Sequence, residues 1–283
     1  MDEHERYFYD LNGYIVVPGA LSPEVLERMH AAIDQHRDQI SIRKGDLHLD
    51  GRTTEQGGIP AEGLRGTHGR GDFGGYLFWE KPWCEPFREI IAPVRILRMM
   101  VEIIGPRVRL EGTAGISMAQ GAEGFILHGG GTPELDRMRD AYYHRFEYGR
   151  MYSGLISVSY ALTDENEENG GFVCIPGSHK ANYLCPRDVR RLERDLGVVR
   201  KVPLEAGDAV VFTESLTHGT VPWKGQHERR LLRYLYCPAL HGRYNPQFRD
   251  FASELDELQQ LVVLEHDWRV GLGEVLEAAA AAA

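Results

Sequence analysis

The pattern of apolar and polar residues indicates a strand followed by a helix near the start of the chain. Residues 13–17 form a β-branched run that ends in a Pro-Gly pair, which predicts a short strand and a turn. Ser22 is a suitable helix cap, Pro23 suits the first helical position, and apolar residues then recur at helical spacing as far as Ile33. We therefore expect a helix from Pro23 onward.

Two longer segments follow, and their patterns differ. Residues 44–76 are rich in glycine and polar side chains, and the segment is too long for a simple connection, so it is predicted to be a lid or binding loop. Residues 86–104 have helical periodicity and are followed by a Gly-Pro pair, which predicts one helix that ends there.

From residue 107 the pattern changes to short extended segments separated by turn signals. The expected strands are residues 107–120, 124–128, 150–162, 171–175, 198–202, 208–212 and 229–237. Helical periodicity returns only in residues 187–196 and 247–264. Because the helices flank the strands and do not alternate with them, the pattern predicts a mainly β fold, an antiparallel sandwich or barrel braced by helices.

The chain is expected to form one domain. It contains no internal repeat and no recognisable linker, so residues 1–275 are interpreted as a single unit. Residues 276–283, Leu-Glu followed by six alanines, resemble the remnant of an expression tag and are set aside.

Composition and charge exclude several classes of partner. The net charge is -10 and the arginines are scattered along the chain, which argues against nucleic acid. No apolar run approaches the roughly 18 residues of a membrane span, and the charged first residues do not resemble a signal peptide, so a cytoplasmic protein is expected. The four cysteines are far apart, which predicts reduced, mostly buried thiols.

Two histidines are candidate metal ligands. His128 ends an apolar segment, and His218 follows the expected strand 208–212 after a short loop. Two histidines and one carboxylate form a facial triad that binds Fe(II) and leaves other coordination positions open. Each histidine alone is more commonly structural, but the pair favours a metal site. A carboxylate two residues after the first histidine would complete such a site, and that position is Gly130.

Four segments carry a resemblance to a known family. They are residues 11–21 (LNGYIVVPGAL), 170–180 (GGFVCIPGSHK), 207–212 (GDAVVF) and 218–220 (HGT). In this order they resemble the phytanoyl-CoA dioxygenase family of Fe(II)/2-oxoglutarate-dependent oxygenases. The resemblance spans nearly the whole chain and implies a double-stranded β-helix core, which is the cupin-like jelly roll.

The resemblance also implies the roles of several residues. His128 and His218 would hold Fe(II), which 2-oxoglutarate chelates before O2 reacts. Arg229, eleven residues past His218, would bind the distal carboxylate of 2-oxoglutarate, because a planar guanidinium makes two charge-assisted hydrogen bonds. Strand alternation places Arg229, Leu231 and Arg233 on one face. The alternative is that Arg229 is a solvated surface charge and that Arg230 or Arg233 binds the cosubstrate.

Other residues are candidates for the cofactor pocket or for positions near the site. Met118, Gln120 and Ser157 or Ser159 occupy positions where the family lines its cofactor pocket, or they simply point outward. His179, at the end of the Pro-Gly-Ser-His segment, is expected to have a turn role and not to bind iron. His144 faces either substrate or solvent, in the segment 129–149 that we interpret as a second lid.

Gly130 leaves three interpretations open. In the first, the iron position stays free for an anion such as chloride, as in the radical halogenases of the superfamily, whose motif is His-X-Gly or His-X-Ala. In the second, water or a lid carboxylate completes the shell and the enzyme remains a hydroxylase; the candidates are Glu134, Asp136, Asp140 and Glu147. In the third, the site is degenerate and the protein is a non-catalytic, cupin-like binding protein.

The sequence thus predicts an Fe(II)/2-oxoglutarate-dependent oxidoreductase that acts on an unactivated C–H bond of a small molecule. Of the first two interpretations we prefer the halogenase. The expected lids carry arginines that favour an acidic or phosphorylated ligand or are merely solvated: Arg65, Arg70, Arg137, Arg139, Arg145 and Arg150. The identity of the substrate and the oligomeric state stay open.

Overall fold

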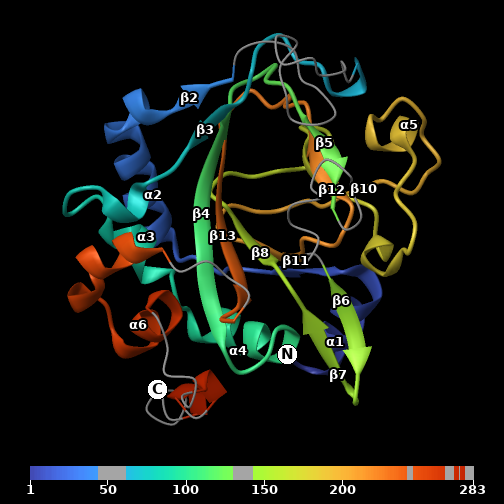
Figure 1. Ribbon diagram of the computed structural model, residues 1–283. Helices are drawn as coiled ribbons and strands as arrows, with labels where there is room; N and C mark the ends of the chain where they lie inside the picture. The colour runs from blue at the N-terminus through green and yellow to red at the C-terminus, as the bar shows by residue number, and fades with distance from the viewer. Residues whose placement is uncertain (44–61, 130–142, 241–244, 265–270, 274, 278–283) are drawn as a thin grey trace.

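The structure is a computed structural model that describes residues 1–43, 62–129, 143–240, 245–264, 271–273 and 275–277. Most of its strands form two antiparallel sheets that face each other, with helices on the outer face of the larger sheet (Figure 1). Phe172 of the smaller sheet packs on Phe212 of the larger one with their ring centroids 5.0 Å apart. The mainly β fold predicted from the sequence is therefore confirmed.

Each sheet draws its strands from distant parts of the chain. The larger sheet has the order β1 (Tyr14–Val17), β11 (Ala209–Thr213), β8 (Ile156–Ala161), β13 (Arg229–Pro238), β4 (Val108–Met118), β3 (Gly71–Phe73) and β2 (Ser41–Ile42). The smaller sheet has the order β10 (Arg200–Lys201), β9 (Gly171–Cys174), β12 (His218–Val221) and β5 (Phe125–His128). A separate hairpin joins β6 (His144–Glu147) to β7 (Arg150–Ser153).

Several helices cover one side of the larger sheet. The α-helices are α1 (Glu3–Asn12), α2 (Pro23–Gln35), α3 (Glu85–Glu89), α4 (Val94–Ile103), α5 (Arg187–Arg190) and α6 (Glu257–Val263). Short 3-10 turns are η1 (Arg37–Gln39), η3 (Glu62–Leu64), η4 (Tyr76–Phe78), η6 (Ser178–Lys180), η7 (Pro246–Asp250) and η8 (Ala252–Glu254). In Figure 1, α2, α3 and α6 lie beside β4, whereas α5 lies beyond the smaller sheet. The main hydrophobic core forms between these helices and the larger sheet.

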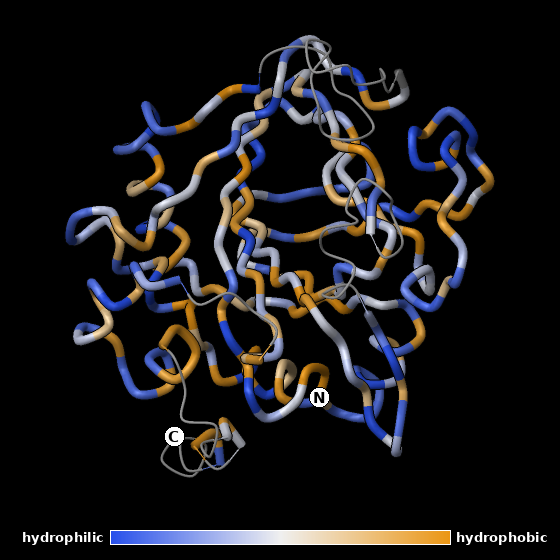
Figure 2. The backbone as a smooth tube through the Cα atoms, in the orientation of Figure 1, coloured by the Kyte–Doolittle hydropathy of each residue, from blue (hydrophilic) through white to orange (hydrophobic). Residues whose placement is uncertain are grey.

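Strand alternation gives the larger sheet two different faces. Leu232, Tyr234 and Tyr236 of β13 belong to the core beneath the helices, so Arg229 and Arg233 project toward the smaller sheet. The apolar cluster between the sheets is much smaller than the outer core. Figure 2 shows hydrophobic residues along the interior strands and hydrophilic residues in the surrounding loops. Buried polar side chains, among them Ser157 and Arg229, lie on the face of the larger sheet that looks toward the smaller one.

Several predicted elements are confirmed and others are shorter than expected. The first strand and the helix α2 are present, and the Ser22 side chain accepts a hydrogen bond from the Val25 amide as a helix cap. The single helix expected in residues 86–104 is wrong, because α3 ends at Glu89 and α4 begins at Val94 with Pro93 as its N-cap. Proline disfavours a helical conformation in the residue before it and lacks an amide proton, so one helix does not continue through Pro93. Helix α1 was not expected from the sequence.

The remaining differences concern turns that the apolar pattern does not reveal. Residues 150–162 form two strands, β7 and β8, interrupted at Gly154. The helix expected in residues 187–196 is one turn, and the strand expected in 198–202 has two paired residues. Residues 247–264 divide into η7, η8 and α6. The described part of the expected 44–76 loop contains strand β3, which pairs with β4.

Three further expectations concern the ends of the chain, the membrane and the cysteines. Leu276, which we assigned to a tag remnant, is 3% exposed and packs in the main core, while residues 278–283 lie outside the described part of the chain. No helix among the described residues has the length and apolar character needed to cross a membrane. All four cysteines are free thiols, and three of them are buried, as expected.

Candidate metal centre

His128 and His218 lie directly opposite each other on neighbouring strands of the smaller sheet. His128 ends β5, His218 begins β12, and the two residues are register partners whose ring centroids are 4.4 Å apart. Each ring donates its Nδ1 proton to the carbonyl oxygen two residues earlier, at 2.8 Å to Ile126 and 2.7 Å to Leu216. With the proton on Nδ1, the Nε2 atom of each ring keeps its lone pair, which is available to bind a metal.

Both histidines are held in the neutral form that binds metal. Burial lowers the pKa of His128 to about 3, and the neighbouring His218 contributes to the shift. Burial also lowers the pKa of His218 to about 4. The His218 Nε2 atom is buried and has no hydrogen-bond partner among the described residues. An unpartnered buried lone pair is costly unless a ligand binds it, so this atom fits a metal ion.

A third potential ligand lies beside the two histidines, and the sequence analysis did not identify it. Glu214, in the loop between β11 and β12, is 3% exposed, and its Oε2 atom lies 3.7 Å from His218 Nε2. The structure brings three potential ligand atoms within 4.8 Å of one another, one each from His128, Glu214 and His218. The only sequence signal was an acid four residues before a candidate histidine, immediately after a buried strand.

The glycine that follows His128 is explained by a close backbone contact. Gly129 has a φ of 139°, and a Cβ atom added there would lie 2.1 Å from the Leu216 carbonyl oxygen. Only glycine tolerates both this conformation and this approach. The chain after His128 therefore packs against the loop that carries Glu214. Gly130 lies outside the described residues.

Arg229 faces the inter-sheet space, as predicted, but it already has a carboxylate partner. It is 1% exposed, so it is not a solvated surface charge. Its Nε atom lies 2.9 Å from Glu165 Oε1, and its Nη1 atom lies 3.3 Å from the sulfur of Met118, its register partner on β4. Met118 and Arg229, both candidates for the cofactor pocket, are thus in contact, and the sequence analysis did not identify Glu165.

Arg233 and Ser157 share this inter-sheet face. Arg233 Nη1 lies 3.9 Å from Glu214 Oε1, and the buried Nε atom of Arg233 has no hydrogen-bond partner among the described residues. Ser157 is completely buried, and its Oγ atom also lacks a partner there. Ser159 is the register partner of Arg233. These unpartnered polar atoms are consistent with a binding site for a polar molecule.

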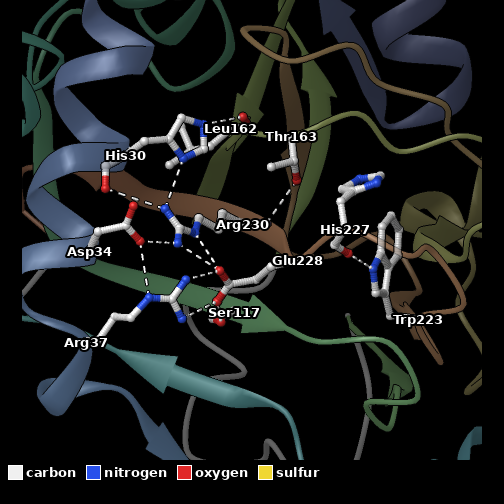
Figure 3. A network of polar contacts seen from close by, with 10 residues as sticks. All are labelled: His30, Asp34, Arg37, Ser117, Leu162, Thr163, Trp223, His227, Glu228 and Arg230. Carbon is white, nitrogen blue, oxygen red and sulfur yellow. Dashed lines mark hydrogen bonds and ion pairs between the residues drawn. The ribbon is translucent and has the colours of Figure 1, made fainter.

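Arg230 lies on the opposite face of β13 and is not a candidate for the site. Its guanidinium donates to Glu228 Oε2 at 2.8 and 2.9 Å and to the Asp34 carboxylate of α2 (Figure 3). Arg37 donates to the same Glu228 oxygen at 2.6 Å, and the Ser117 hydroxyl donates to the other oxygen. This network fastens α2 to β4 and β13 and leaves Arg229 or Arg233 as the cosubstrate candidates.

The other predicted residues lie elsewhere or outside the described chain. Gln120 is exposed beyond β4 and donates to the Lys224 carbonyl oxygen at 3.3 Å. His179 has the expected structural role, since its Nε2 atom donates to the Asp10 carbonyl oxygen at 3.0 Å. His144 bonds to the Ser153 hydroxyl at 2.8 Å and faces His179.

The described part of the expected second lid is the β6–β7 hairpin. Glu147 is exposed on it and is not part of the histidine cluster, and Glu134, Asp136 and Asp140 lie outside the described residues. Of the arginines expected to favour an acidic ligand, Arg137 and Arg139 also lie outside, and Arg70 is paired with Asp72. Arg145 and Arg150 are exposed on the hairpin, and their guanidinium groups lie over the rings of Tyr143 and Tyr152, respectively.

Among the solved structures whose fold is similar to that of this chain are those of three proteins. HygX from Streptomyces hygroscopicus, solved with nickel and 2-oxoglutarate, is 19% identical with a TM-score of 0.65 over 87% of this chain and 90% of that chain. The non-heme alpha ketoglutarate dependent epimerase SnoN is 17% identical with a TM-score of 0.57 over 84% and 82%. The carbocyclase SnoK is 17% identical with a TM-score of 0.55 over 84% and 85%. This likeness shows a shared fold, the cupin-like jelly roll.

Comparison by sequence gives more specific information than the shared fold. No curated protein sequence matches it. The sequence profile of phytanoyl-CoA dioxygenase (PhyH), however, matches residues 9–231, a span that includes β1, the histidine pair, Glu214 and Arg229. The chain therefore belongs to the phytanoyl-CoA dioxygenase (PhyH) family.

Proposed function

We propose that the protein is an Fe(II)- and 2-oxoglutarate-dependent oxidoreductase that acts on a C–H bond of a small molecule. The observation that carries this proposal is the pair of buried, neutral histidines on β5 and β12, whose Nε2 atoms are left available by matching Nδ1 hydrogen bonds. Their donor set fits Fe(II), because imidazole nitrogens with a carboxylate form the facial site of non-haem iron oxygenases. Iron bound there with 2-oxoglutarate supplies the oxygen-activating chemistry.

The inter-sheet face of the larger sheet carries residues that suit 2-oxoglutarate. The inter-sheet face carries two arginines, Arg229 and Arg233, and the unpartnered hydroxyl of Ser157. Arg229 is our candidate for the distal carboxylate, held in place by Glu165 on its Nε side, and Met118 forms an apolar wall beside it. Arg233 is the alternative, since it lies nearer to the candidate metal ligands. HygX has been solved with nickel and 2-oxoglutarate, which supports this cosubstrate.

A small organic molecule is the proposed substrate. HygX has been solved with hygromycin B and SnoN with nogalamycin RO, so proteins of this fold bind such compounds. For hydroxylation, one oxygen atom of O2 converts 2-oxoglutarate to succinate and carbon dioxide, and the other enters the substrate as a hydroxyl group. The substrate C–H bond supplies the two remaining electrons, so no further reductant is needed.

The proposal is tested by measuring succinate formed by the purified protein with Fe(II), 2-oxoglutarate and O2. We expect succinate release that His218→Ala abolishes. His227→Ala is a matched control, because His227 bonds to the Asp164 carbonyl oxygen away from the cluster. No succinate under any condition would overturn the proposal and favour a non-catalytic binding protein.

Halogenation is the second candidate, and Gly130 is the observation that favours it. A halogenase needs a coordination position that no protein carboxylate fills, with chloride as an additional substrate. Mass spectrometry of product formed with and without chloride or bromide separates the two reactions. A halogenated product would support the halogenase, whereas an oxygenated product whose mass and yield ignore halide would exclude it.

A further inference from the structure

The geometry points to Glu214 as the third protein ligand of the metal, in place of the carboxylate that is absent at Gly130. This inference rests on the metal site proposed above. It completes a facial site of two histidines and one carboxylate with an acid from a different loop, four residues before His218. It also decides between the two candidate reactions, because it fills the position that a halide would need.

The distances place the Glu214 carboxylate where a shared ion would bind. Its Oε2 atom is 3.7 Å from His218 Nε2, and the three ligand atoms of the cluster lie within 4.8 Å of one another. Ligands about 2.1 Å from one ion and at right angles to each other are about 3 Å apart. The cluster is therefore close to a coordinating arrangement and needs only a modest side-chain closure around an ion.

Burial shows that the Glu214 carboxylate lacks the partners that a charge in the interior needs. The residue is 3% exposed, and its Oε1 atom has no hydrogen-bond partner among the described residues. The Arg233 guanidinium lies 3.9 Å away, which is too far for a hydrogen bond. Buried charges are normally paired or bound to metal, so a cation between Glu214 and the histidines would neutralise the carboxylate and bind the unpartnered His218 Nε2.

The backbone explains why the acid comes from this loop. A side chain at Gly129 would collide with the carbonyl oxygen of Leu216 at 2.1 Å and approach that of Glu214 at 3.1 Å. The segment from Glu214 to Leu216 thus packs directly on the chain that leaves His128. The Glu214 side chain reaches the metal position from there, and the main chain of the segment is anchored by a 3.0 Å hydrogen bond from the Glu214 amide to the Leu155 carbonyl oxygen.

A third protein ligand at this position favours the transfer of oxygen to the substrate over the transfer of halide. If His128, Glu214 and His218 held Fe(II), the open coordination positions would be needed for 2-oxoglutarate and O2. No position is then reserved for chloride, and the carboxylate charge opposes a second anion beside it. We therefore expect a hydroxylated or otherwise oxidised product and not a chlorinated one.

The test is metal binding by Glu214→Gln, which keeps the side-chain shape and removes the charge. Anaerobic titration calorimetry with Fe(II), and with Co(II) as a spectroscopic probe, should show at least a tenfold loss of affinity and a changed Co(II) absorption spectrum, since even changes beyond the direct ligands cost about 10–100-fold. Glu147→Gln, an exposed acid on β6, is the matched control and should bind both ions like the wild type.

Folding and the underlying proposal are checked separately. Metal-free Glu214→Gln should melt at the same or a higher temperature than the metal-free wild type, because it removes a buried charge whose nearest cation, Arg233, lies 3.9 Å away and makes no hydrogen bond to it. Wild-type affinity in Glu214→Gln, with affinity lost in His218→Ala, would overturn the role of Glu214 and leave the metal site standing. Unchanged affinity in both variants would overturn the proposed metal site itself.

Gly130→Asp in a Glu214→Ala background is a rescue experiment. A carboxylate at the usual motif position should recover most of the metal affinity that Glu214→Ala loses, if the two positions serve the same ion. Recovery would support the inference. Failure of Gly130→Asp to improve binding over Glu214→Ala would show that Glu214 does not substitute for the motif acid.

Discussion

Glu165 and Arg229 form an ion pair that is closed off from solvent. Their side chains are each 1% exposed, and Oε1 of Glu165 lies 2.9 Å from Nε of Arg229. Gly171 makes room for the pair, since a Cβ atom there would be 2.3 Å from Glu165 Oε2. The second carboxylate oxygen accepts from the Phe172 amide at 3.2 Å. The guanidinium that we propose for 2-oxoglutarate thus already holds one carboxylate of the protein.

Glu165→Gln should make the protein more dependent on 2-oxoglutarate. The variant leaves Arg229 buried without a counter-charge, which costs about 3–5 kcal/mol of unfolding free energy. The distal carboxylate of 2-oxoglutarate would restore part of this, so the cosubstrate should raise the melting temperature more in the variant than in the wild type. The measurement is thermal unfolding with and without 2-oxoglutarate. An equal or smaller shift in the variant would mean that Arg229 is not the anchor.

Arg229→Lys and Arg233→Lys should differ in their affinity for 2-oxoglutarate. Lysine keeps the charge but loses the two-pronged geometry, so Arg229→Lys should weaken binding by about tenfold, corresponding to about 1.4 kcal/mol. Arg233→Lys should have a smaller effect. Equilibrium binding of 2-oxoglutarate in the presence of Fe(II) without O2 gives both values. The reverse order would assign the distal carboxylate to Arg233.

Ser157→Ala should separate binding from stability. The Ser157 hydroxyl is buried without a hydrogen-bond partner among the described residues, so its removal should change the unfolding free energy by less than about 1 kcal/mol. If the hydroxyl binds 2-oxoglutarate, the dissociation constant should rise several-fold. Denaturant unfolding and cosubstrate titration together check this. A large loss of stability with unchanged affinity would assign Ser157 to the fold alone.

Glu228→Ala should destabilise the protein without directly affecting the metal site. Glu228 joins Arg37 and Arg230 on the outer face of the larger sheet, and Arg230 is mostly buried. Removal of this shared partner should cost about 2–4 kcal/mol. Glu89→Ala, which breaks an exposed pair with Arg28, should have a much smaller effect. Similar denaturant midpoints for Glu228→Ala and the wild type would contradict the clamp role of this network.

His179 should make the fold sensitive to acid. Burial, with a contribution from neighbouring His144, lowers the pKa of His179 to about 4, whereas an unfolded histidine titrates near 6.5. Because the folded state binds fewer protons, stability is complete above pH about 6.5 and falls as the pH decreases toward 4. Linkage gives a loss of about 2 kcal/mol between pH 7 and 5. Denaturant unfolding of metal-free His179→Gln should show a loss smaller by that amount, and equal losses would contradict this assignment.

The elements that the sequence predicted well are those with strong local signals. The alternation in β13 placed Arg229 and Arg233 on one face and Arg230 on the other, as the structure has them. The split of the 86–104 helix at Pro93 was missed because apolar periodicity continues across the break. Short strands such as β3 owe their pairing to distant partners, and local sequence carries little of that information.

The site was predictable only as far as its motifs reach. His128 and His218 follow from residue types and spacing, and Arg229 and Met118 follow from the family resemblance. The structure pairs the last two across β13 and β4. Glu214 and Glu165 could not be identified in the same way. Their closeness to the site depends on how β11 meets β12 and how the segment after β8 packs against β9. An acid in a loop has no local feature that distinguishes a buried ligand from a solvated charge.

The segment between β11 and β12 links metal binding to the local stability of the two sheets. It crosses from the larger sheet to the smaller one within four residues and carries Glu214 at one end and His218 at the other. An ion bound by both residues and by His128 would tie the rims of the two sheets together. Amide hydrogen exchange in residues 213–218 should then report on metal occupancy, so that loading of the centre and protection of this segment become one cooperative event.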